Sequence, residues 1–455
     1  MSVNRRRLFA AFAGASAGAA TPALARDAWQ SDTAPRAVID AAALGLHPNA
    51  EADQSAALQR AIERVAAAGA VLRLAPGIYR AGGLQLPSYA ALVGVAGTTQ
   101  IVMTGGPSLF AATASDHVSL CGLVLDGGNI PLPDGRGLIH LAQGRALRIA
   151  DCEIVGAGGD GIRLQAIAGE VTGNVVNAAE SAILSNDAAG LRIAGNTVRG
   201  AGNGGILVSR DSPGDDGTLV IDNRIDNVDN RRGGSGQWGN AINVFRADNV
   251  IVRGNRIRHA AFSAVRGNSA SNIQIVGNTC TGLGETALYS EFAFQGALIA
   301  NNVVDGAAVG VAVANFDQGG RLAVVQGNLI RNLKRGRPAG VEPGDGAALG
   351  IAVEADAVVA GNVVENVPGT AIAAGYGPYL RDVAITGNVV RGADYGIAVS
   401  VVSGAGTAVI SDNLISGARH GAIVGREWDK TVTGDLSRDG AERYAQLSIG
   451  GNRVR

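Results

Sequence analysis

Short runs of alternating apolar and polar residues recur along the chain from about residue 149 onward. The runs Ile162–Gln165 and Ile206–Ser209, for example, place an apolar side chain at every second position. This period of two is typical of a β-strand that buries one face. Helical periodicity is absent from these runs, so the pattern predicts an all-β structure for most of the chain.

The runs belong to a repeated unit that closes on Gly-Asn-x-Val or a variant of it. The asparagines that close the units are Asn174, Asn196, Asn223, Asn255, Asn278, Asn302, Asn328, Asn362, Asn388, Asn413 and Asn452. Their spacings run from 22 to 39 residues, which fits one solenoid coil per unit with insertions in some coils. We predict a single-stranded right-handed parallel β-helix of roughly 12–13 coils over residues 76–455. Because asparagine tolerates a left-handed backbone and its amide both donates and accepts, we expect these residues at corners, bonded in a column.

A different pattern precedes the repeats, over residues 38–75. Leu58, Ile62 and Val65 follow helical spacing, Asp53 or Ser55 can cap the helix, and Gly69 ends it. A solenoid exposes the end of its core, so we expect this amphipathic helix to cap the first coil.

The first residues have the composition of an export signal. A basic segment with paired arginines, residues 5–7, precedes an alanine-rich apolar run that ends in a small-x-small motif at Ala25. We expect residues 1–25 to be a signal peptide read by the twin-arginine translocase, followed by a linker over residues 26–37. The mature protein is then periplasmic or secreted and has no transmembrane segment. The alternative is a basic N-terminal helix that stays attached.

Composition narrows the classes of partner and cofactor. The chain has 67 glycines, 4% aromatic residues and a net charge of −1, so no global field favours nucleic acid. Cys121, Cys152 and Cys280 do not form a disulfide framework, and we expect buried thiols. Metal-binding motifs such as CxxC and HExxH are absent, and we expect no cofactor. A loop with Asp211, Asp215 and Asp216 offers carboxylates to calcium, although a solvated turn is the preferred interpretation.

The N-terminal segment resembles a known family. The segment from Asp40 to Gly45, the helix over 53–62 and the turn Pro76-Gly77-x-Tyr79 look like the N-terminal cap of the pectin-lyase-like superfamily of right-handed β-helices. That superfamily includes pectate lyases, polygalacturonases and phage tailspikes. The twin-arginine signal with Gly-Asn coils also resembles a bacterial family of exported repeat proteins without an assigned function. The resemblance implies the fold but not the chemistry.

The sequence departs from the enzymes of that superfamily at their active sites. The polygalacturonase series of Asn-Thr-Asp, Asp-Asp, Gly-His-Gly and Arg-Ile-Lys is missing. Fragments at Asp160-Gly161 and His420-Gly421 lie 260 residues apart and cannot form one site. A candidate site must therefore be argued from the geometry of the coils.

Outward-facing residues of equivalent strands should form columns, with neighbours about 4.8 Å apart. One column reads Arg163, Leu184, Leu207, Asn243, Arg266, Tyr289, Ala312, Ala352, Ala373, Ala398 and Val424. The next reads Gln165, Asn186, Ser209, Phe245, Asn268, Glu291, Ala314, Glu354, Gly375, Ser400 and Arg426. Chemically active side chains concentrate in the middle of both columns.

Two insertions point to the same region. Residues 229–240 and 334–347 emerge from one side of the solenoid and bracket the middle coils. We expect them to wall a groove over coils 4–8, with Arg266 and Tyr289 on its floor and with His259, Phe262 and Glu285 on the wall. The remaining expected ligand-binding residues are Asn243, Phe245, Arg246, Asn268, Asn315, Arg321, Glu354 and Trp238.

These residue types suit two chemistries on a polysaccharide. Arg266 would neutralise a substrate carboxylate while Tyr289 or His259 moves a proton, as β-elimination from a uronate or C5 epimerisation requires. Glu291 and Glu354 lie two coils apart in one column, about 9.6 Å between backbones, near the carboxyl separation of an inverting glycosidase. We expect an exported polysaccharide-binding protein that acts as a lyase, epimerase or hydrolase. The alternative is a non-catalytic carbohydrate-binding or envelope-structural repeat protein.

Overall fold

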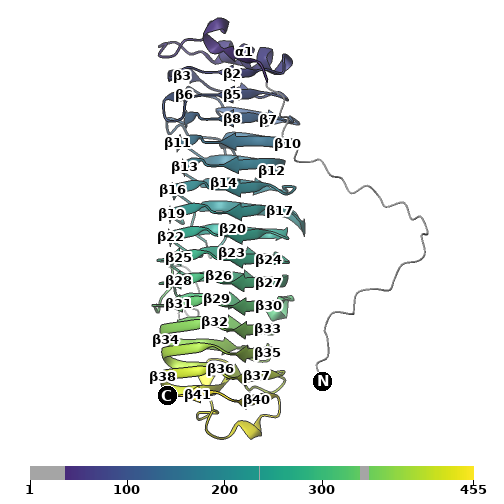
Figure 1. The fold of residues 1–455 in the computed structure, drawn as a ribbon, viewed down its shortest axis with the longest axis vertical. Helices are drawn as coiled ribbons and strands as arrows, with labels where there is room; N and C mark the ends of the chain where they lie inside the picture. The colour runs from purple at the N-terminus through teal and green to yellow at the C-terminus, as the bar shows by residue number, and fades with distance from the viewer. Residues whose placement is uncertain (1–35, 235, 339–347) are drawn as a thin grey trace, which may run out of the picture. The chain divides into compact units, whose positions relative to one another are not determined.

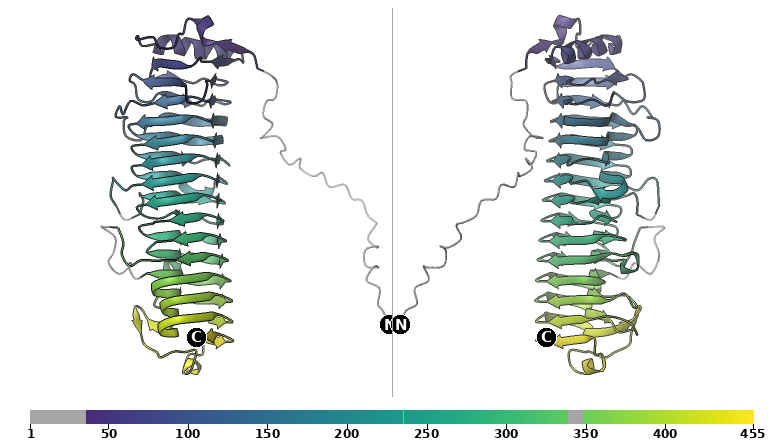
Figure 2. Two further views of the ribbon diagram at one scale, coloured as in Figure 1. Left: turned by 60° about the vertical axis from the view of Figure 1, so that its left-hand side comes forward. Right: turned by 90° about the vertical axis from the view of Figure 1, so that its right-hand side faces the viewer.

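Each coil of the solenoid stacks its strands in parallel on the corresponding strands of the next coil (Figures 1 and 2). The computed structural model describes residues 36–234, 236–338 and 348–455. The expected signal peptide, nearly all of the expected linker and most of the second insertion lie outside these residues. Within them the strands pair in parallel, except for β38 with β39 (Lys430–Thr431), so the predicted all-β parallel solenoid is confirmed.

The strands form three faces, named here first, second and third in the cyclic order in which each full coil from β4 onward visits them. The first face contains β4 (Leu84–Gln85), β7 (Phe110–Thr113), β10 (Gly137–Ala150), β12 (Asp160–Thr172), β14 (Ser181–Asn186), β17 (Gly204–Asp215), β20 (Asn240–Asp248), β23 (Val265–Asn268), β26 (Thr286–Glu291), β29 (Val309–Val313), β32 (Leu349–Val353), β34 (Val363–Ala374), β36 (Val389–Ser400) and β38 (Leu414–Glu427). Five of these, β10, β12, β34, β36 and β38, are long enough to continue into another face.

The other two faces are built from shorter strands. The second contains β1 (Val38–Asp40), β2 (Val71–Arg73), β5 (Ala91–Val93), β8 (Ser119–Cys121), β15 (Arg192–Ala194), β18 (Leu219–Ile221), β21 (Ile251–Arg253), β24 (Ile273–Val276), β27 (Gln295–Ala300), β30 (Arg321–Gln326), β33 (Ala355–Ala360), β35 (Arg381–Thr386), β37 (Ala408–Ser411) and β40 (Leu447–Gly450). The third contains β3 (Gly77–Ala81), β6 (Thr99–Met103), β9 (Val124–Asp126), β11 (Glu153–Ala157), β13 (Val175–Ala178), β16 (Thr197–Ala201), β19 (Arg224–Val228), β22 (Arg256–Ala260), β25 (Thr279–Thr281), β28 (Val303–Asp305), β31 (Leu329–Arg331) and β41 (Arg453–Val454).

The solenoid has about 14 coils, slightly more than the 12–13 expected. The difference arises at the N-terminal end, where coils form before the first ladder asparagine. The core consists of apolar columns in register from coil to coil, since each strand buries alternate residues. One such column, fully or almost fully buried, is Ile206, Ile242, Val265, Leu288, Val311, Ile351, Ile372, Ile397 and Ile423.

Helix α1 (Ser55–Ala67) covers the N-terminal end of the stack, as predicted (Figure 1). Leu58, Ile62 and Val65 are fully buried and the helix contacts β2, β4 and β5. Asp53 accepts a hydrogen bond from the backbone N–H of Ser55 at 2.9 Å, and Gly69 adopts a left-handed φ of 61° just after the helix. A 3-10 turn, η1 (Ala41–Leu44), precedes it.

The predicted asparagine column exists and is continuous. Each side-chain amide from Asn174 to Asn413 donates to the Oδ1 of the next ladder asparagine at 2.9 to 3.0 Å. The column begins at Cys152, whose backbone N–H donates to Asn174 at 3.0 Å. The expected left-handed backbone, however, belongs to the preceding residue, such as Gly173 or Asp222, with φ of 68° and 57°. The prediction was wrong on this point because the ladder asparagine must keep its own N–H aligned with the next coil.

The C-terminal end of the stack is closed by residues 428–446. Asp435 accepts backbone N–H groups of Ala422 and Ile423 on the last first-face strand, at 3.0 and 3.2 Å. Leu436 packs there with 4% of its surface exposed, and η4 (Ala441–Arg443) leads into β40. These contacts satisfy an edge that would otherwise be open to pairing. No helix among the described residues is long and apolar enough to cross a membrane.

Candidate functional site

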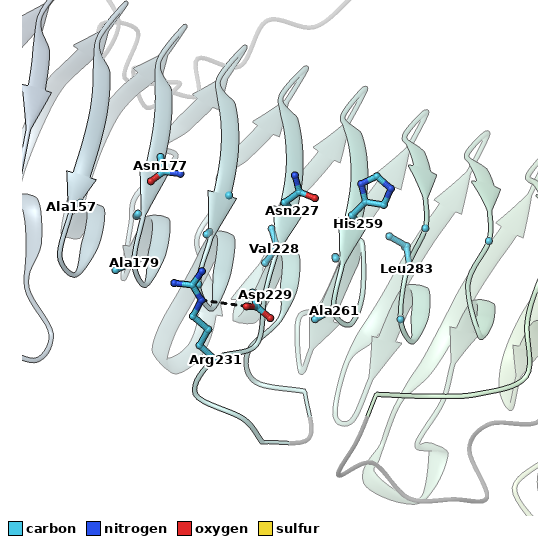
Figure 3. Close-up of a pocket in the computed structure, with 18 of the residues that line it drawn as sticks. Ala157, Asn177, Ala179, Asn227, Val228, Asp229, Arg231, His259, Ala261 and Leu283 are labelled. Atoms are coloured by element: carbon cyan, nitrogen blue, oxygen red, sulfur yellow. Dashed lines mark hydrogen bonds and ion pairs between the residues drawn. The ribbon is translucent and has the colours of Figure 1, made fainter. Parts of the chain in front are cut away.

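A groove runs along the corner where third-face strands turn into the first face (Figure 3). It encloses about 800 Å³, and its lining extends from Asn129, after β9, to Lys334, after β31. Nine coils contribute, so at about 4.8 Å per coil the lining spans roughly 38 Å parallel to the solenoid axis. A cavity of this form accommodates an extended chain rather than a compact ligand.

The groove exists because the corner residues are small. Its floor is formed by Ala157, Ala178, Ala179, Gly200, Ala201, Gly202, Val228, Ala260, Ala261, Gly282, Leu283, Gly284 and Gly306. Successive coils approach so closely here that a β-carbon at Gly202 would overlap the carbonyl oxygen of Ala179. The polar side chains of the lining are Asn129, Asn177, Asn227, Asp229, Arg231, His259 and Lys334.

His259 is the titratable ring in this groove. Its Nδ1 lies 3.0 Å from Oδ1 of Asp226, one coil away, and its side chain is 55% exposed. Gly282 makes room for the ring, since a β-carbon there would lie 2.9 Å from the His259 Cδ2 atom. A carboxylate that accepts the Nδ1 proton leaves Nε2 of a neutral imidazole as an acceptor. The pair can therefore take a proton from a ligand in the groove.

Two cationic side chains flank His259 along the axis. The backbone N–H of Arg231 bonds to Gly202, toward the N-terminal end, while that of Lys334 bonds to Ala307, toward the C-terminal end, both at 2.9 Å. Arg231 lies 3.3 Å from Asp229, and both side chains are more than 60% exposed, at 67% and 61%. Asp229 is the one carboxylate among the described lining residues, so with Arg231 and Lys334 the lining has one cation in excess.

The predicted site on the first face is also a real cluster. The expected register is present, with Asn243 beside Arg266 and Arg266 beside Tyr289. Nε of Arg266 donates to Oε1 of Glu291 at 2.6 Å, and the guanidinium carbon lies 5.4 Å from the Tyr289 ring centroid. Asn268 donates to the same Glu291 oxygen at 3.0 Å. The structure thus brings four of the expected residues together.

This cluster does not form the floor of an open groove, so that prediction was wrong. The side chains of Arg266 and Glu291 are only 11% and 3% exposed. The first insertion folds over them, with Gly236 against the Arg266 guanidinium. In the second insertion, Arg337 approaches Glu285 at 3.9 Å. The Arg266–Glu291 pair offsets part of the desolvation cost that this burial imposes on the two charges.

Burial also changes the chemistry of the covered cluster. Burial raises the pKa of Glu285, and burial followed by the charge of Glu291 raises the pKa of Tyr289. A phenol with a raised pKa holds its proton more tightly, so less phenolate is present at neutral pH to accept a proton from a ligand. Phe262 and Glu285, expected on the groove wall, are instead buried, with 0% and 5% of their surface exposed.

Other expected residues lie elsewhere on the solenoid. Arg246 stacks on Phe245 at 4.7 Å and donates to the Asp211 carbonyl at 2.9 Å. Asn243 is half-buried, and its Oδ1 has no hydrogen-bond partner among the described residues. Trp238 lies under Arg232, whose guanidinium carbon is 5.2 Å from the ring centroid.

Glu354 belongs to a third group, around the turn η2 (Phe316–Gln318). Its carboxyl accepts the backbone N–H of Phe316 at 2.7 Å, and burial raises its pKa to about 7. Asn315 accepts the N–H of Phe292 at 3.2 Å, and Arg321 pairs with Asp356 at 3.2 Å. These contacts anchor the turn against neighbouring coils.

Sequence reasoning missed Asp226 and the asparagines of the groove. Asp226 lies on β19 in register with Arg258, the residue before His259. A column drawn through third-face strands would have placed the two side chains on adjacent coils. The columns predicted from the sequence follow the first face, so they do not include this pair.

The described residues contain no group of three or more His, Cys, Asp or Glu side chains arranged to hold a metal ion. Asp211 and Asp215, expected in a loop, lie on β17 and accept amide hydrogens from Asn186 and Asn249. The cysteines are free, and burial raises the pKa of both Cys152 and Cys280 to about 12. Such thiols are chemically inert.

Comparison with solved structures finds similar coils in several proteins. The N-terminal fragment of bacteriophage phi29 gene product 12 is 15% identical, covers 92% of this chain and 70% of its own, and gives a TM-score of 0.49. The catalytic unit of a GH87 α-1,3-glucanase from Streptomyces thermodiastaticus is 14% identical, with coverages of 92% and 69% and a TM-score of 0.47. The A-module of Azotobacter vinelandii mannuronan C-5 epimerase AlgE6 is 13% identical, with coverages of 91% and 99% and a TM-score of 0.40. At these sequence identities the similarity concerns the fold alone.

No curated protein matches the chain by sequence. A family model does match, described as the right handed beta helix region, over residues 124–225 and 213–380. These segments cover more than half of the chain and agree with the handedness predicted from its sequence. The chain therefore belongs to the right-handed β-helix family.

Proposed function

We propose that this chain binds an acidic polysaccharide along the corner groove and acts on it as a lyase or epimerase. The observation that carries the proposal is the His259–Asp226 pair, at 3.0 Å, within an axis-parallel groove that has cations on both sides of the pair. A uronate polymer is long, linear and anionic, which matches all three features of the groove.

The residues suit abstraction of a proton next to a carboxylate. The C5–H bond of a uronate breaks, the proton moves to Nε2 of His259, and the electron pair delocalises into the sugar carboxylate. Arg231 or Lys334 stabilises the charge that develops there. In β-elimination the C4–O bond then breaks, and the departing oxygen takes a proton from the His259 imidazolium. In epimerisation C5 instead takes a proton from water on its opposite face, and the imidazolium later returns its proton to solvent.

Hydrolysis finds less support. An inverting glycosidase needs two carboxyl groups roughly 6.5–9.5 Å apart on either side of the bond. Glu291, one of the expected pair, is bonded to Arg266 under the first insertion, and Glu354 is bonded to the Phe316 backbone. The groove lining offers Asp229 alone among the described residues.

The proposed activity is consistent with the expected export from the cytoplasm. An acidic polysaccharide is an extracellular or envelope polymer, and the basic and apolar segments of residues 1–25 support export by the twin-arginine pathway. If the following experiment detects no reaction, the alternative of a non-catalytic binding protein is favoured.

The test is incubation of the purified protein with polygalacturonate, alginate and neutral glucans. Unsaturated uronate is followed by ultraviolet absorbance, epimers by NMR and new reducing ends in parallel. We expect absorbance or epimer signals on an acidic polymer, reduced about 100-fold or more in His259→Gln. His420→Gln, on another part of the surface, is the matched control. New reducing ends without unsaturation, or unchanged activity in His259→Gln, would refute the proposal.

A further inference from the structure

A second pocket, of about 310 Å³, opens on the first face beside the N-terminal part of the groove. Ala157, Ala179 and Arg231 line the groove, and the residues that directly follow them line the pocket. The two openings are therefore adjacent. The pocket lining also includes the loop before β10, residues 132–136. A ligand in the groove therefore passes close to the pocket.

Three guanidinium groups converge on this pocket, from Arg136, Arg163 and Arg232. Nη1 of Arg163 donates to Asp160 at 2.8 Å, and Nε of Arg232 lies 2.7 Å from Glu180. Each guanidinium carries five N–H donors, so these pairings hold the groups in place and leave other donors available.

The two carboxylates are themselves anchored by the coils. Asp160 is 6% exposed and also accepts the backbone N–H of Ser181 at 3.0 Å. Glu180 accepts the side-chain amide of Asn203 at 2.6 Å. They line the pocket and hold Arg163 and Arg232 in place.

Arg136 is the third arginine of the pocket. It is exposed, and its side chain makes no hydrogen bond or ion pair among the described residues, while its backbone N–H donates to Pro133 at 3.0 Å. The pKa of the neighbouring His140 is lowered, first by burial and then by the positive charges of Arg136 and Arg163. Asp134 also lines the pocket, so its three arginines face three carboxylates. The groups available to an anion are the guanidinium donors that these carboxylates leave free.

Trp238 adds an apolar wall to the pocket. The ring is partly buried and lies against Arg232, 5.2 Å from the guanidinium carbon to the ring centroid. An indole wall beside an arginine fork matches a sugar ring that carries a carboxylate, since the ring stacks on the apolar face while the carboxylate takes paired N–H bonds.

We propose that this pocket binds a single uronate residue of the glycan that occupies the groove. The choice of a sugar rests on the proposed function, whereas the preference for a carboxylate rests on the three arginines. A pocket for one acidic residue would select chains that carry such a residue near the end of the groove containing β11 to β16.

The experiment titrates the full-length protein with glucuronate, glucose and acetate, followed by calorimetry and by ligand-observed NMR. We expect glucuronate to bind more tightly than glucose and than acetate. Arg136→Gln should weaken glucuronate about 10-fold or more. Because Arg136 is exposed, this variant should fold normally, which thermal unfolding checks. Arg145→Gln, with a side chain that is 83% exposed and outside the pocket lining, is the matched control.

A second variant separates the sugar from the charge. Trp238→Ala should weaken glucuronate while leaving acetate unchanged, because acetate has no ring to stack. Equal affinity for glucose and glucuronate, or full glucuronate binding in Arg136→Gln, would overturn the proposal. His259→Gln separates the two proposals, since we expect it to abolish the reaction in the groove and leave glucuronate binding intact. Loss of binding in that variant would also count against a separate pocket.

Discussion

Gly236 lies directly against the guanidinium of Arg266, so closely that a β-carbon on Gly236 would overlap its Nη1 atom. Gly236 belongs to the first insertion and Arg266 to β23, one coil further on. The same guanidinium is bonded to Glu291 at 2.6 Å. Because of this contact, the first insertion covers the cluster and does not form the wall of an open groove. The candidate site therefore lies at the adjoining corner and not on the first face.

We predict that Gly236→Ala destabilises the protein by about 2 kcal/mol or more, because the new methyl group must displace a buried, paired arginine. Gly233→Ala in the same insertion is the control. Both glycines have left-handed φ values, 137° and 73°, but nothing lies within 4 Å of a β-carbon at Gly233. Urea unfolding measures both variants, and equal losses would show that the insertion does not press on Arg266.

Removal of the carboxylate that pairs with Arg266 should be more costly. In Glu291→Ala the guanidinium stays buried without its closest partner, which destabilises by about 3–5 kcal/mol. The double variant Arg266→Met, Glu291→Leu should recover much of this loss because neither charge remains. At a temperature where the variants remain folded, we expect unchanged turnover in the groove. Loss of turnover in a folded double variant would restore a catalytic role to the cluster.

The asparagine ladder should be most sensitive in its middle. Asn278 is 1% exposed and donates to Val252 and Asn302 while accepting from Asn255. Asn278→Ala leaves buried donors unpaired and should reduce the free energy of unfolding by about 2–4 kcal/mol. The same change at the partly exposed terminal Asn452 should cost clearly less, since water replaces its partners. Unfolding curves compare the two, and an equal cost would argue against burial as the cause.

Glu354 should make stability depend on pH. Its pKa is raised from an ordinary 4.5 to about 7 by burial, so between these values the folded protein holds a proton that the unfolded chain releases. Stability should therefore fall as pH rises from 4.5 to about 7, by up to about 3 kcal/mol. Glu354→Gln should remove this loss and be the more stable protein at about pH 8, roughly one unit above that pKa. The exposed Glu51→Gln is the control, and parallel pH profiles for Glu354→Gln and wild type would contradict the prediction.

Asp226 should act through His259 as a positioning residue. Asp226→Asn no longer selects the tautomer with Nε2 free, so we expect kcat to fall about 100-fold with little change in KM. Arg231→Gln, which contacts the ligand in the proposal, should instead raise KM. Equal effects of both variants on KM would mean that Asp226 supports only the shape of the groove.

Much of the fold follows from repeating local signals. Alternation in runs such as Ile162–Gln165 sets which side chains point inward, and the recurring asparagines place each coil over the last. Because neighbours in space are one repeat apart in sequence, even the column Asn243, Arg266 and Tyr289 is in the predicted register. The capping helix follows equally from the spacing of Leu58, Ile62 and Val65.

The sequence by itself thus determined the all-β solenoid, its ladder, its cap and the order of its outward columns. Only the tertiary structure decided where a ligand can enter. The path of the first insertion depends on packing between residues such as Gly236 and Arg266, for which no local pattern exists. The groove depends on small residues from successive coils, nine of which contribute between Asn129 and Lys334, and on one pair, Asp226 and His259, brought together by stacking. A groove forms where several neighbouring coils carry small residues, so it exists only when the coils are assembled.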